Sequence, residues 1–331
     1  MSARPLPWVL LVAIVIPSLV FAEQPALALF PRPPELTGAV EFWKRVFAVY
    51  GTDQGVVHDS EDLTIIYGVE GLGGRAESGR ERERQQAQQA ALARYRRALE
   101  RFANDQVDTT RLAGDDLRVW LALGKTTDRM RYRCAVESLR LQVGQKDRFE
   151  RGLTASEPYI KEMRRILRSH SVSDSLAVLP FIESAFDVRA YSKAGAAGLW
   201  QITRPTGRRF LKINRRIDER RDPFKSTSAA ARILRENRDF LGNWPLAITA
   251  YNHGPNGMAR AVKTLGTQDI ATIIQRYKGK RFGFASRNFY PEFLAALDVI
   301  HSRLQENDSD LPASPLAKDL GQMQSQGQGR Q

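Results

Sequence analysis

The stretch Leu176-Ala177-Val178-Leu179-Pro180-Phe181-Ile182-Glu183-Ser184 decides how the C-terminal half of the chain folds. It is an unbroken apolar run that ends abruptly in a carboxyl and a hydroxyl side chain. An apolar run of this length is buried, so the carboxyl group at its end is poorly solvated. Desolvation favours the neutral acid and raises the pKa of Glu183, as a proton donor near neutral pH requires.

Two further motifs follow this stretch in a fixed order. Gly198-Leu199-Trp200-Gln201 begins fourteen residues after Ser184, and Ala250-Tyr251-Asn252 lies about fifty residues beyond it. The linking segments 186–197, 218–223 and 289–291 belong to the same pattern. A Glu-Ser pair alone is unspecific, but the ordered set resembles the catalytic domain of the soluble lytic transglycosylases, which is goose-type-lysozyme-like. It is most similar to the branch of membrane-bound lytic transglycosylase D, over roughly residues 171–302.

The resemblance implies a reaction with one carboxyl group. Glu183 would protonate the oxygen between N-acetylmuramic acid and N-acetylglucosamine, while the substrate's own N-acetyl group stabilises the developing cation. The Glu183 carboxylate would then take the proton of the C6 hydroxyl, which closes a 1,6-anhydro ring without water. One residue acts first as acid and then as base. The implied substrate and partner is the glycan strand of peptidoglycan.

The resemblance also implies the supporting residues. Ser184 would hydrogen-bond near the acid, Tyr251 would orient it, and Asn252 would hold the acid's helix or the N-acetyl group. Gly198 would let the backbone approach a sugar. Trp200 either packs on a sugar or belongs to the core, and Tyr290 either closes over the acid or packs in the core. The complete set of expected substrate-binding residues is Ser184, Gly198, Leu199, Trp200, Gln201, Tyr251, Asn252 and Tyr290.

Glycoside cleavage usually uses two carboxyl groups, and the nearby candidates for a second one are better explained as structural. Asp187 follows Glu183 by four residues but marks the exit of the helix. Asp218 and Glu219 stand among arginines that would pair with them, and Asp222-Pro223 is typical of a helix start.

Metal and cofactor chemistry find no support in the sequence. The four histidines make no His-x-x-x-His pair, and neither a Gly-x-Ser-x-Gly elbow nor a phosphate loop is present. We therefore expect no metal and no organic cofactor.

The composition favours a polyanionic partner. The net charge is +13 and the isoelectric point is near 10.1, which suits nucleic acid, an anionic membrane or an acidic wall polymer. The positive side chains come mostly as arginine pairs spread along the chain, each expected on the solvated surface. Export would separate the protein from cytoplasmic nucleic acid, so we expect no nucleic-acid partner.

Residues 1–28 have the pattern of a signal peptide. Arg4 is followed by the apolar segment 8–21 and by two candidate cleavage sites, one of them Ala26-Leu27-Ala28. The apolar segment is short for a membrane span and is interrupted by Pro17, so an uncleaved anchor is the weaker alternative. We expect a periplasmic protein without membrane association after cleavage. The single cysteine, Cys134, is expected to be a buried inert thiol.

The expected fold class is mainly α-helical. A lysozyme-like catalytic domain at 151–305 follows a mostly helical region at 29–150 with a short β element, and residues 306–331 form a disordered tail. In the N-terminal region, runs at 56–57 and 63–67 predict a hairpin, and periodic patterns predict helices over 80–103, 112–123 and 132–143. Its role is either a packing platform or a binding surface.

Further helices are expected in the catalytic domain over 151–168, 206–210, 226–240, 245–251 and 291–304, with Ser226-Thr227-Ser228 as a helix cap.

Two alternatives to a lytic transglycosylase remain open at this point. One is a hydrolytic muramidase or chitinase with a second carboxylate, whose products contain an added water. The other is a non-catalytic wall-binding scaffold on a lysozyme-like fold. Five intact motif residues speak against the scaffold: Glu183, Ser184, Gln201, Tyr251 and Asn252.

Overall fold

The computed structural model of the 331-residue chain describes residues 29–74 and 80–310. The expected signal peptide and residues 311–331 of the expected tail lie outside this part. The described part is mainly α-helical with one three-stranded sheet, which confirms the expected class. In it, no helix is both long and apolar enough to cross a membrane.

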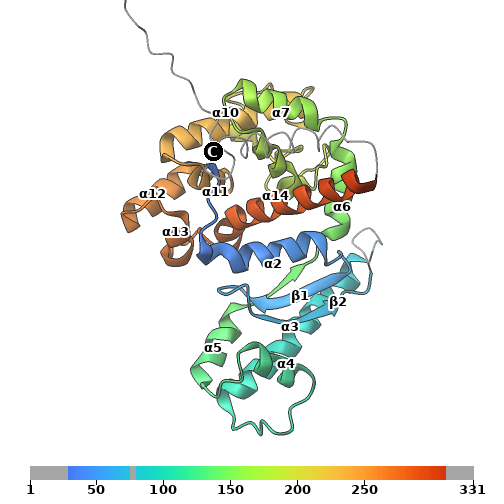
Figure 1. Cartoon of the computed structure of the whole chain (residues 1–331), viewed down its shortest axis with the longest axis vertical. Helices are drawn as coiled ribbons and strands as arrows, with labels where there is room; N and C mark the ends of the chain where they lie inside the picture. The colour runs from blue at the N-terminus through green and yellow to red at the C-terminus, as the bar shows by residue number, and fades with distance from the viewer. Residues whose placement is uncertain (1–28, 75–79, 311–331) are drawn as a thin grey trace, which may run out of the picture.

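Helices pack in two bodies on either side of the small sheet (Figure 1). In chain order the elements are η1 (Pro34–Leu36), α2 (Thr37–Ala48), β1 (Gln54–Asp59), β2 (Ile66–Gly71), α3 (Glu81–Asn104), α4 (Gly114–Ala122), α5 (Arg129–Ser138), β3 (Leu139–Val143), α6 (Lys146–Ser156), α7 (Ile160–Ser169), η3 (Asp174–Val178), α8 (Leu179–Ser184), α9 (Arg204–Gly207), η4 (Glu219–Arg221), α10 (Pro223–Leu241), α11 (Trp244–His253), α12 (Pro255–Leu265), α13 (Ile270–Arg276) and α14 (Phe284–Asp310).

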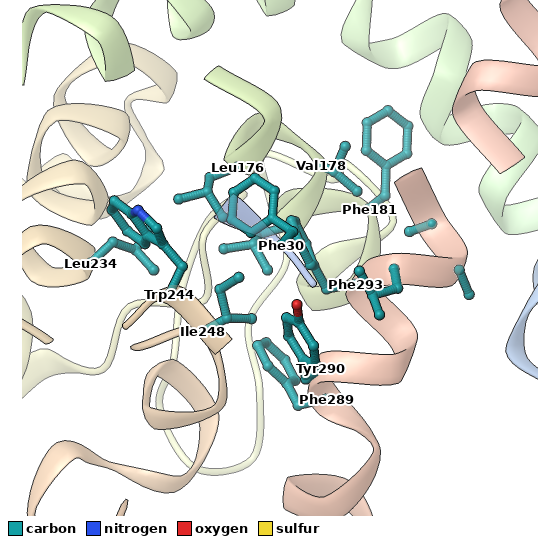
Figure 2. Close-up of a cluster of buried hydrophobic side chains, with 14 of the residues drawn as sticks. Phe30, Leu176, Val178, Phe181, Leu234, Trp244, Ile248, Phe289, Tyr290 and Phe293 are labelled. Carbon is teal, nitrogen blue, oxygen red and sulfur yellow. The ribbon is translucent and has the colours of Figure 1, made fainter. Parts of the chain in front are cut away.

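The larger body contains the segment with the ordered motifs. Helix α14 crosses its middle, with α2 lying alongside it and α7, α10 and α11 on the other side (Figure 1). Aromatic side chains fill the space between these helices. Phe30 lies 5.0 Å from Phe293 and 6.4 Å from Trp244, measured between ring centroids (Figure 2).

The boundary expected at residue 150 does not separate the two cores. Phe30, Trp43 and Phe47 from the N-terminal region belong to the same buried cluster as the catalytic segment. Trp43 and Phe47 do so because α2 presents its apolar face to α14. A smaller cluster lies within residues 57–141, so we call residues 54–143 the insert. The C-terminal boundary also differs from the expected one, because α14 continues to Asp310 rather than ending at residue 305.

Strand β1 lies between the two hydrophobic cores and contributes side chains to both. It pairs antiparallel with β2 on one side and β3 on the other, in the order β2-β1-β3. Successive side chains of a strand point to opposite faces. Val56 accordingly belongs to the larger cluster and Val57 to the smaller one. The predicted hairpin is confirmed, but the expected helix over 132–143 is wrong in its second half, which forms β3.

Several local expectations need correction. The expected helix over 151–168 is two helices, α6 and α7, separated at 157–159. Helix α10 is capped by Asp222, which accepts hydrogen bonds from the backbone N–H groups of Phe224 and Lys225. Ser226 lies inside the helix, where it donates to the Asp222 carbonyl. Cys134 is exposed rather than buried.

Candidate active site

The acid lies in the last turn of a short helix that ends under backbone strain. Helix α8 carries Glu183 and Ser184, and the next two residues, Ala185 and Phe186, both have positive φ angles of 51° and 60°. Positive φ is uncommon for residues other than glycine, and two in succession are costly. The bend lets the Phe186 N–H donate to the Pro180 carbonyl at 3.0 Å, which closes the end of the helix.

The second motif forms a tight turn against α8. The Ser184 hydroxyl lies 3.0 Å from the Leu199 carbonyl oxygen and 3.1 Å from that of Pro180. A hydroxyl donates one proton, so these two carbonyls share it. The contact joins the acid's helix to the 198–201 turn. Gln201 closes this turn by donating from Nε2 to the Gly198 carbonyl at 2.8 Å, at a strained φ of 44°.

The third motif reaches the same turn from α11. Tyr251 donates its hydroxyl proton to the Trp200 carbonyl at 2.8 Å. Two neighbouring carbonyl groups, those of Leu199 and Trp200, are therefore held by Ser184 and Tyr251. The structure thus brings together three motifs that are far apart in the sequence. Tyr251 makes no hydrogen bond with Glu183, so it holds the turn rather than the acid.

The Glu183 carboxyl group keeps its proton to an unusual pH. The residue is half-buried, and its carboxyl makes no hydrogen bond or ion pair among the described residues. Burial raises its pKa from 4.5 to about 8, because desolvation penalises the charged form. Burial and the neighbouring charge of Glu183 likewise raise the pKa of Tyr251 well above its usual value.

Three of the expected substrate-binding residues are core residues. Trp200 is fully buried and donates from its indole nitrogen to Thr227 at 2.9 Å, which decides between its two interpretations. Leu199 is buried as well. Tyr290 is buried on the core side of α14, where its hydroxyl donates to the Pro31 carbonyl at 2.8 Å (Figure 2). These buried side chains pack in the core and support the backbone of the site.

Gly198 is required by a backbone contact within the protein. Its φ is +75°, and a Cβ atom there would lie 2.0 Å from the Arg220 carbonyl oxygen. The glycine therefore permits the close approach of the Arg220 backbone. Arg220 is itself fully buried and donates to the carbonyls of Gly195 and Ile202 at 2.7 and 3.0 Å, so this arginine is not on the solvated surface as expected.

Asn252 and Gln201 both keep side chains that solvent can reach. Asn252 is exposed at the end of α11, and its Oδ1 accepts a hydrogen bond from Ser286 of α14 at 3.0 Å. His253 Nδ1 lies 3.2 Å from the same hydroxyl. Gln201 is half-buried. These contacts tie α11 to the beginning of α14 and leave the Asn252 amide nitrogen without a hydrogen bond among the described residues.

The expected structural roles of the nearby carboxyl groups agree with the contacts. Asp218 pairs with Arg220 at 2.7 Å and Glu219 with Lys225 at 2.8 Å. Asp187 is exposed and accepts the backbone N–H of Arg189 at 2.8 Å. None of them is an unpaired acid.

One carboxyl group with a raised pKa was missed by the sequence analysis. Glu292 of α14 is half-buried, and burial together with the charge of Glu183 raises its pKa well above the ordinary value. The signal that could have found it is the one used for Glu183, since Glu292 interrupts the apolar run 289–296.

A search for concave surfaces alone would select a different region of the protein as the candidate site. A concavity of about 620 Å³ lies between α3 and α4 in the insert. Its charged side chains pair with one another: Arg94 lies 3.0 Å from Asp115, and Arg101 pairs with Asp116. No group of His, Cys, Asp and Glu side chains in the described ranges is arranged to hold a metal ion. The unpaired Glu183 carboxyl on α8 is therefore the better candidate for an active group.

Comparisons with known proteins cover the segment that carries the three motifs. Residues 163–274 match the family model of the transglycosylase SLT domain, a segment that contains Glu183 and all three motifs. Membrane-bound lytic murein transglycosylase D of Escherichia coli K12 is 36% identical over 154 residues, which is 44% of this chain and 32% of that protein. The same enzyme from Escherichia coli O6:H1 gives the same values. The resemblance inferred from the motifs is confirmed for this segment.

The matches cover only part of the chain and of its relatives. The chain spans about a third of the length of the curated relatives named here. A solved structure of an inactive mutant of lytic transglycosylase Slt from Pseudomonas aeruginosa is 18% identical, with a TM-score of 0.36, over 63% of this chain and 37% of that one.

Proposed function

We propose that the protein is a peptidoglycan lytic transglycosylase that cleaves the β-1,4 bond between N-acetylmuramic acid and N-acetylglucosamine and leaves 1,6-anhydro ends. The observation that carries the proposal is the state of Glu183. It is an unpaired carboxyl with a pKa of about 8, inside the segment that matches the SLT domain. A carboxyl in this state is a proton donor at neutral pH.

In the proposed reaction Glu183 acts twice. Its proton passes to the glycosidic oxygen as the bond to C1 breaks, and the N-acetyl carbonyl of the substrate stabilises the positive charge at C1. The Glu183 carboxylate then takes the proton of the C6 hydroxyl, whose oxygen bonds to C1. Every proton is returned, so the enzyme needs no water and no second base.

The surroundings of Glu183 suit this double role. The strained end of α8 and the Ser184 contact fix the helix that carries the acid, and Tyr251 fixes the turn beside it. A fixed acid needs little reorganisation between its two proton transfers. The exposed Asn252 amide is available to the N-acetyl group, and the net charge of +13 attracts the free carboxylates of peptide stems.

We further propose that residues 1–28 direct export to the periplasm and that the mature protein acts there on the glycan strands. The names of the two Escherichia coli relatives describe membrane-bound murein enzymes. A chain beginning at Leu29 is expected to stay in solution without detergent. Recovery of the native protein only with detergent would instead favour an uncleaved anchor at 8–21.

The mass of the products tests the function. Purified sacculi are digested with the protein, and the released muropeptides are weighed. The proposal requires anhydro products. Products heavier by one water would identify a hydrolytic muramidase, and no release from sacculi together with tight binding would identify a scaffold.

A further inference from the structure

The end of α11 is joined to the start of α14 by two hydrogen bonds whose direction is fixed by the groups that make them. Ser286 Oγ lies 3.0 Å from Asn252 Oδ1, and His253 Nδ1 lies 3.2 Å from the same hydroxyl oxygen. An amide oxygen only accepts, so the single hydroxyl proton of Ser286 goes to Asn252. The hydroxyl oxygen therefore accepts its other hydrogen bond from His253, whose Nδ1 carries the proton.

The imidazole ring of His253 is held in place by its neighbours. The ring of Phe282 meets it edge-on, with 5.0 Å between the ring centroids. A Cβ atom at Gly257 would lie 2.5 Å from the ring atoms Cδ2 and Nε2, so any larger residue there would displace the ring. Burial and the charge of Arg260 lower the pKa of His253, which keeps the ring neutral at neutral pH. A neutral ring has one N–H group, and His253 donates it to Ser286.

The turn of α14 that carries Ser286 is fixed as well. Ser286 itself is buried. Its neighbour Arg287 donates two hydrogen bonds to the Glu61 carboxylate, at 2.6 and 2.5 Å, and Asn288 accepts one from the Trp43 indole at 3.0 Å. Glu61 lies between β1 and β2, so the insert helps to hold the first turn of α14. The Ser286 hydroxyl is therefore a donor at a fixed place.

These contacts decide which end of the Asn252 amide is offered to a ligand. The Asn252 side chain is exposed, and its oxygen is engaged by Ser286. A half-turn of the amide would lose this hydrogen bond and set its NH₂ group against a hydroxyl that still needs an acceptor. The NH₂ group therefore points away from Ser286, and within residues 29–74 and 80–310 it has no hydrogen-bond partner. A group held in this way selects a ligand with a hydrogen-bond acceptor, such as a carbonyl oxygen.

Resting on the proposed function, we propose that Ser286 and His253 are positioning residues that hold the Asn252 amide so that its NH₂ group donates to the N-acetyl carbonyl of the glycan. His253 sets the direction by donating to Ser286, and Ser286 transmits it by donating to Asn252. Neither residue contacts the substrate or exchanges a proton with it. Their effect on the reaction passes entirely through Asn252.

A double-mutant cycle tests whether the effect passes through Asn252. In Ser286→Ala the Asn252 amide is free to turn, and kcat/KM on soluble glycan is expected to fall about three- to tenfold, the loss of one neutral hydrogen bond. Asn252→Ala removes the donor itself. In that background Ser286→Ala is expected to cause no further loss. Losses that multiply in the double variant would overturn the proposal, and so would a folded Ser286→Ala protein with unchanged kcat/KM.

Two further variants separate positioning from general damage to the fold. Ser286→Thr keeps the hydroxyl, so a folded protein is expected to retain kcat/KM close to the wild-type value. Thr249→Val is the matched control, because it removes a buried hydroxyl of the same helix α11 that donates to the Pro245 carbonyl at 2.9 Å and not to Asn252. It is expected to leave kcat/KM unchanged. Equal losses in Thr249→Val and Ser286→Ala would overturn the proposal.

The direction of the hydrogen bonds is measured in the wild-type protein without any activity. Long-range ¹H–¹⁵N NMR spectra at neutral pH show which ring nitrogen of each histidine carries the proton, and the His253 signals are assigned by their absence in His253→Asn. The proposal requires a neutral His253 ring protonated at Nδ1. A ring protonated at Nε2 alone would overturn it. This result stands whether or not the protein forms anhydro products, so failure of the proposed function is recognised separately by product mass.

Discussion

Two groups of carboxyl side chains in the larger body differ in one respect, their partners. In the loop before α10, Asp218 accepts two hydrogen bonds from Arg220 at 2.8 and 2.7 Å. Glu219 accepts one from Lys225 at 2.8 Å. Glu183 of α8 and Glu292 of α14 have no partner of this kind within residues 29–74 and 80–310.

The pKa values move in opposite directions as a result. The hydrogen bonds from Arg220 and Lys225 lower the pKa of Asp218 and Glu219, whereas burial raises the pKa of Glu183 and Glu292. The first group is ionised and stabilises the loop. The second holds its protons at a cost in stability, and only the second can supply one to a substrate.

The largest expected effect is the loss of activity when the unpaired acid is replaced. Glu183→Gln keeps the shape of the acid but has no proton to give, so sacculus digestion should fall by about a hundred- to ten-thousandfold. Rates of muropeptide release by equal amounts of folded protein measure it. Asp187→Asn, the control, should keep most of its activity. An active Glu183→Gln protein would remove Glu183 from the reaction, and an inactive but folded Asp187→Asn protein would revive a two-carboxylate mechanism.

The next largest effect is a loss of stability when the paired carboxyl of Asp218 is replaced. Asp218→Asn leaves the buried Arg220 guanidinium without its counter-charge, and we expect a loss of about 3 kcal/mol in the free energy of unfolding. Urea unfolding followed by circular dichroism gives this value. Glu219→Gln can keep the hydrogen bond from the Lys212 backbone N–H and loses only the pairing with the exposed Lys225, so it should change the midpoint much less. Equal effects of the two substitutions would mean that burial of Arg220 does not depend on Asp218.

The pH dependence of stability sharpens the comparison further. The Glu183 pKa is about 8 in the folded protein and near 4.5 when unfolded. The folded state therefore binds the extra proton, and stability falls as pH rises from 4.5 to 8. Glu183→Gln lacks this loss. Its free energy of unfolding should match that of the wild type at pH 4 and exceed it by about 4 kcal/mol at pH 7.5.

The stability contributed by the paired carboxyl of Asp218 changes with pH in the opposite direction. Because the folded pKa of Asp218 is lowered, its contribution is present at neutral pH and is lost as pH falls below the usual range of Asp. Thermal unfolding of wild type and Glu183→Gln across pH 3 to 8 separates the two trends. A difference between these proteins that stays constant with pH would contradict the raised pKa of Glu183.

The sequence was most informative where a residue's role depends on its close neighbours in the chain. An acid at the end of an apolar run, followed by two motifs, located Glu183 and the turn at 198–201. The arginine-rich context also predicted the pairing of Asp218 with Arg220, whereas Glu219 pairs with Lys225 and not with an arginine. These inferences succeed because each rests on neighbours within a few residues.

The failures concern contacts between distant segments. Strand β3 exists because β1 offers it an edge, which a helix-like pattern over 132–143 does not reveal. The sequence left two interpretations of Tyr290 open, one at the acid and one in the core, and the contact of its hydroxyl with the Pro31 carbonyl decides for the core. Helical periodicity groups residues by face, yet the packing partner of each face is set by tertiary structure.

The most direct test of the account is the titration of Glu183 itself, since the central claim is that this carboxyl is protonated at neutral pH. Its ¹³C resonance, assigned by its absence in Glu183→Gln, is followed from pH 3 to 10 in the wild-type protein. The account predicts a first midpoint near 8. A midpoint near 4.5, the value of an ordinary exposed glutamate, would show that Glu183 is ionised at neutral pH and would contradict its role as the proton donor.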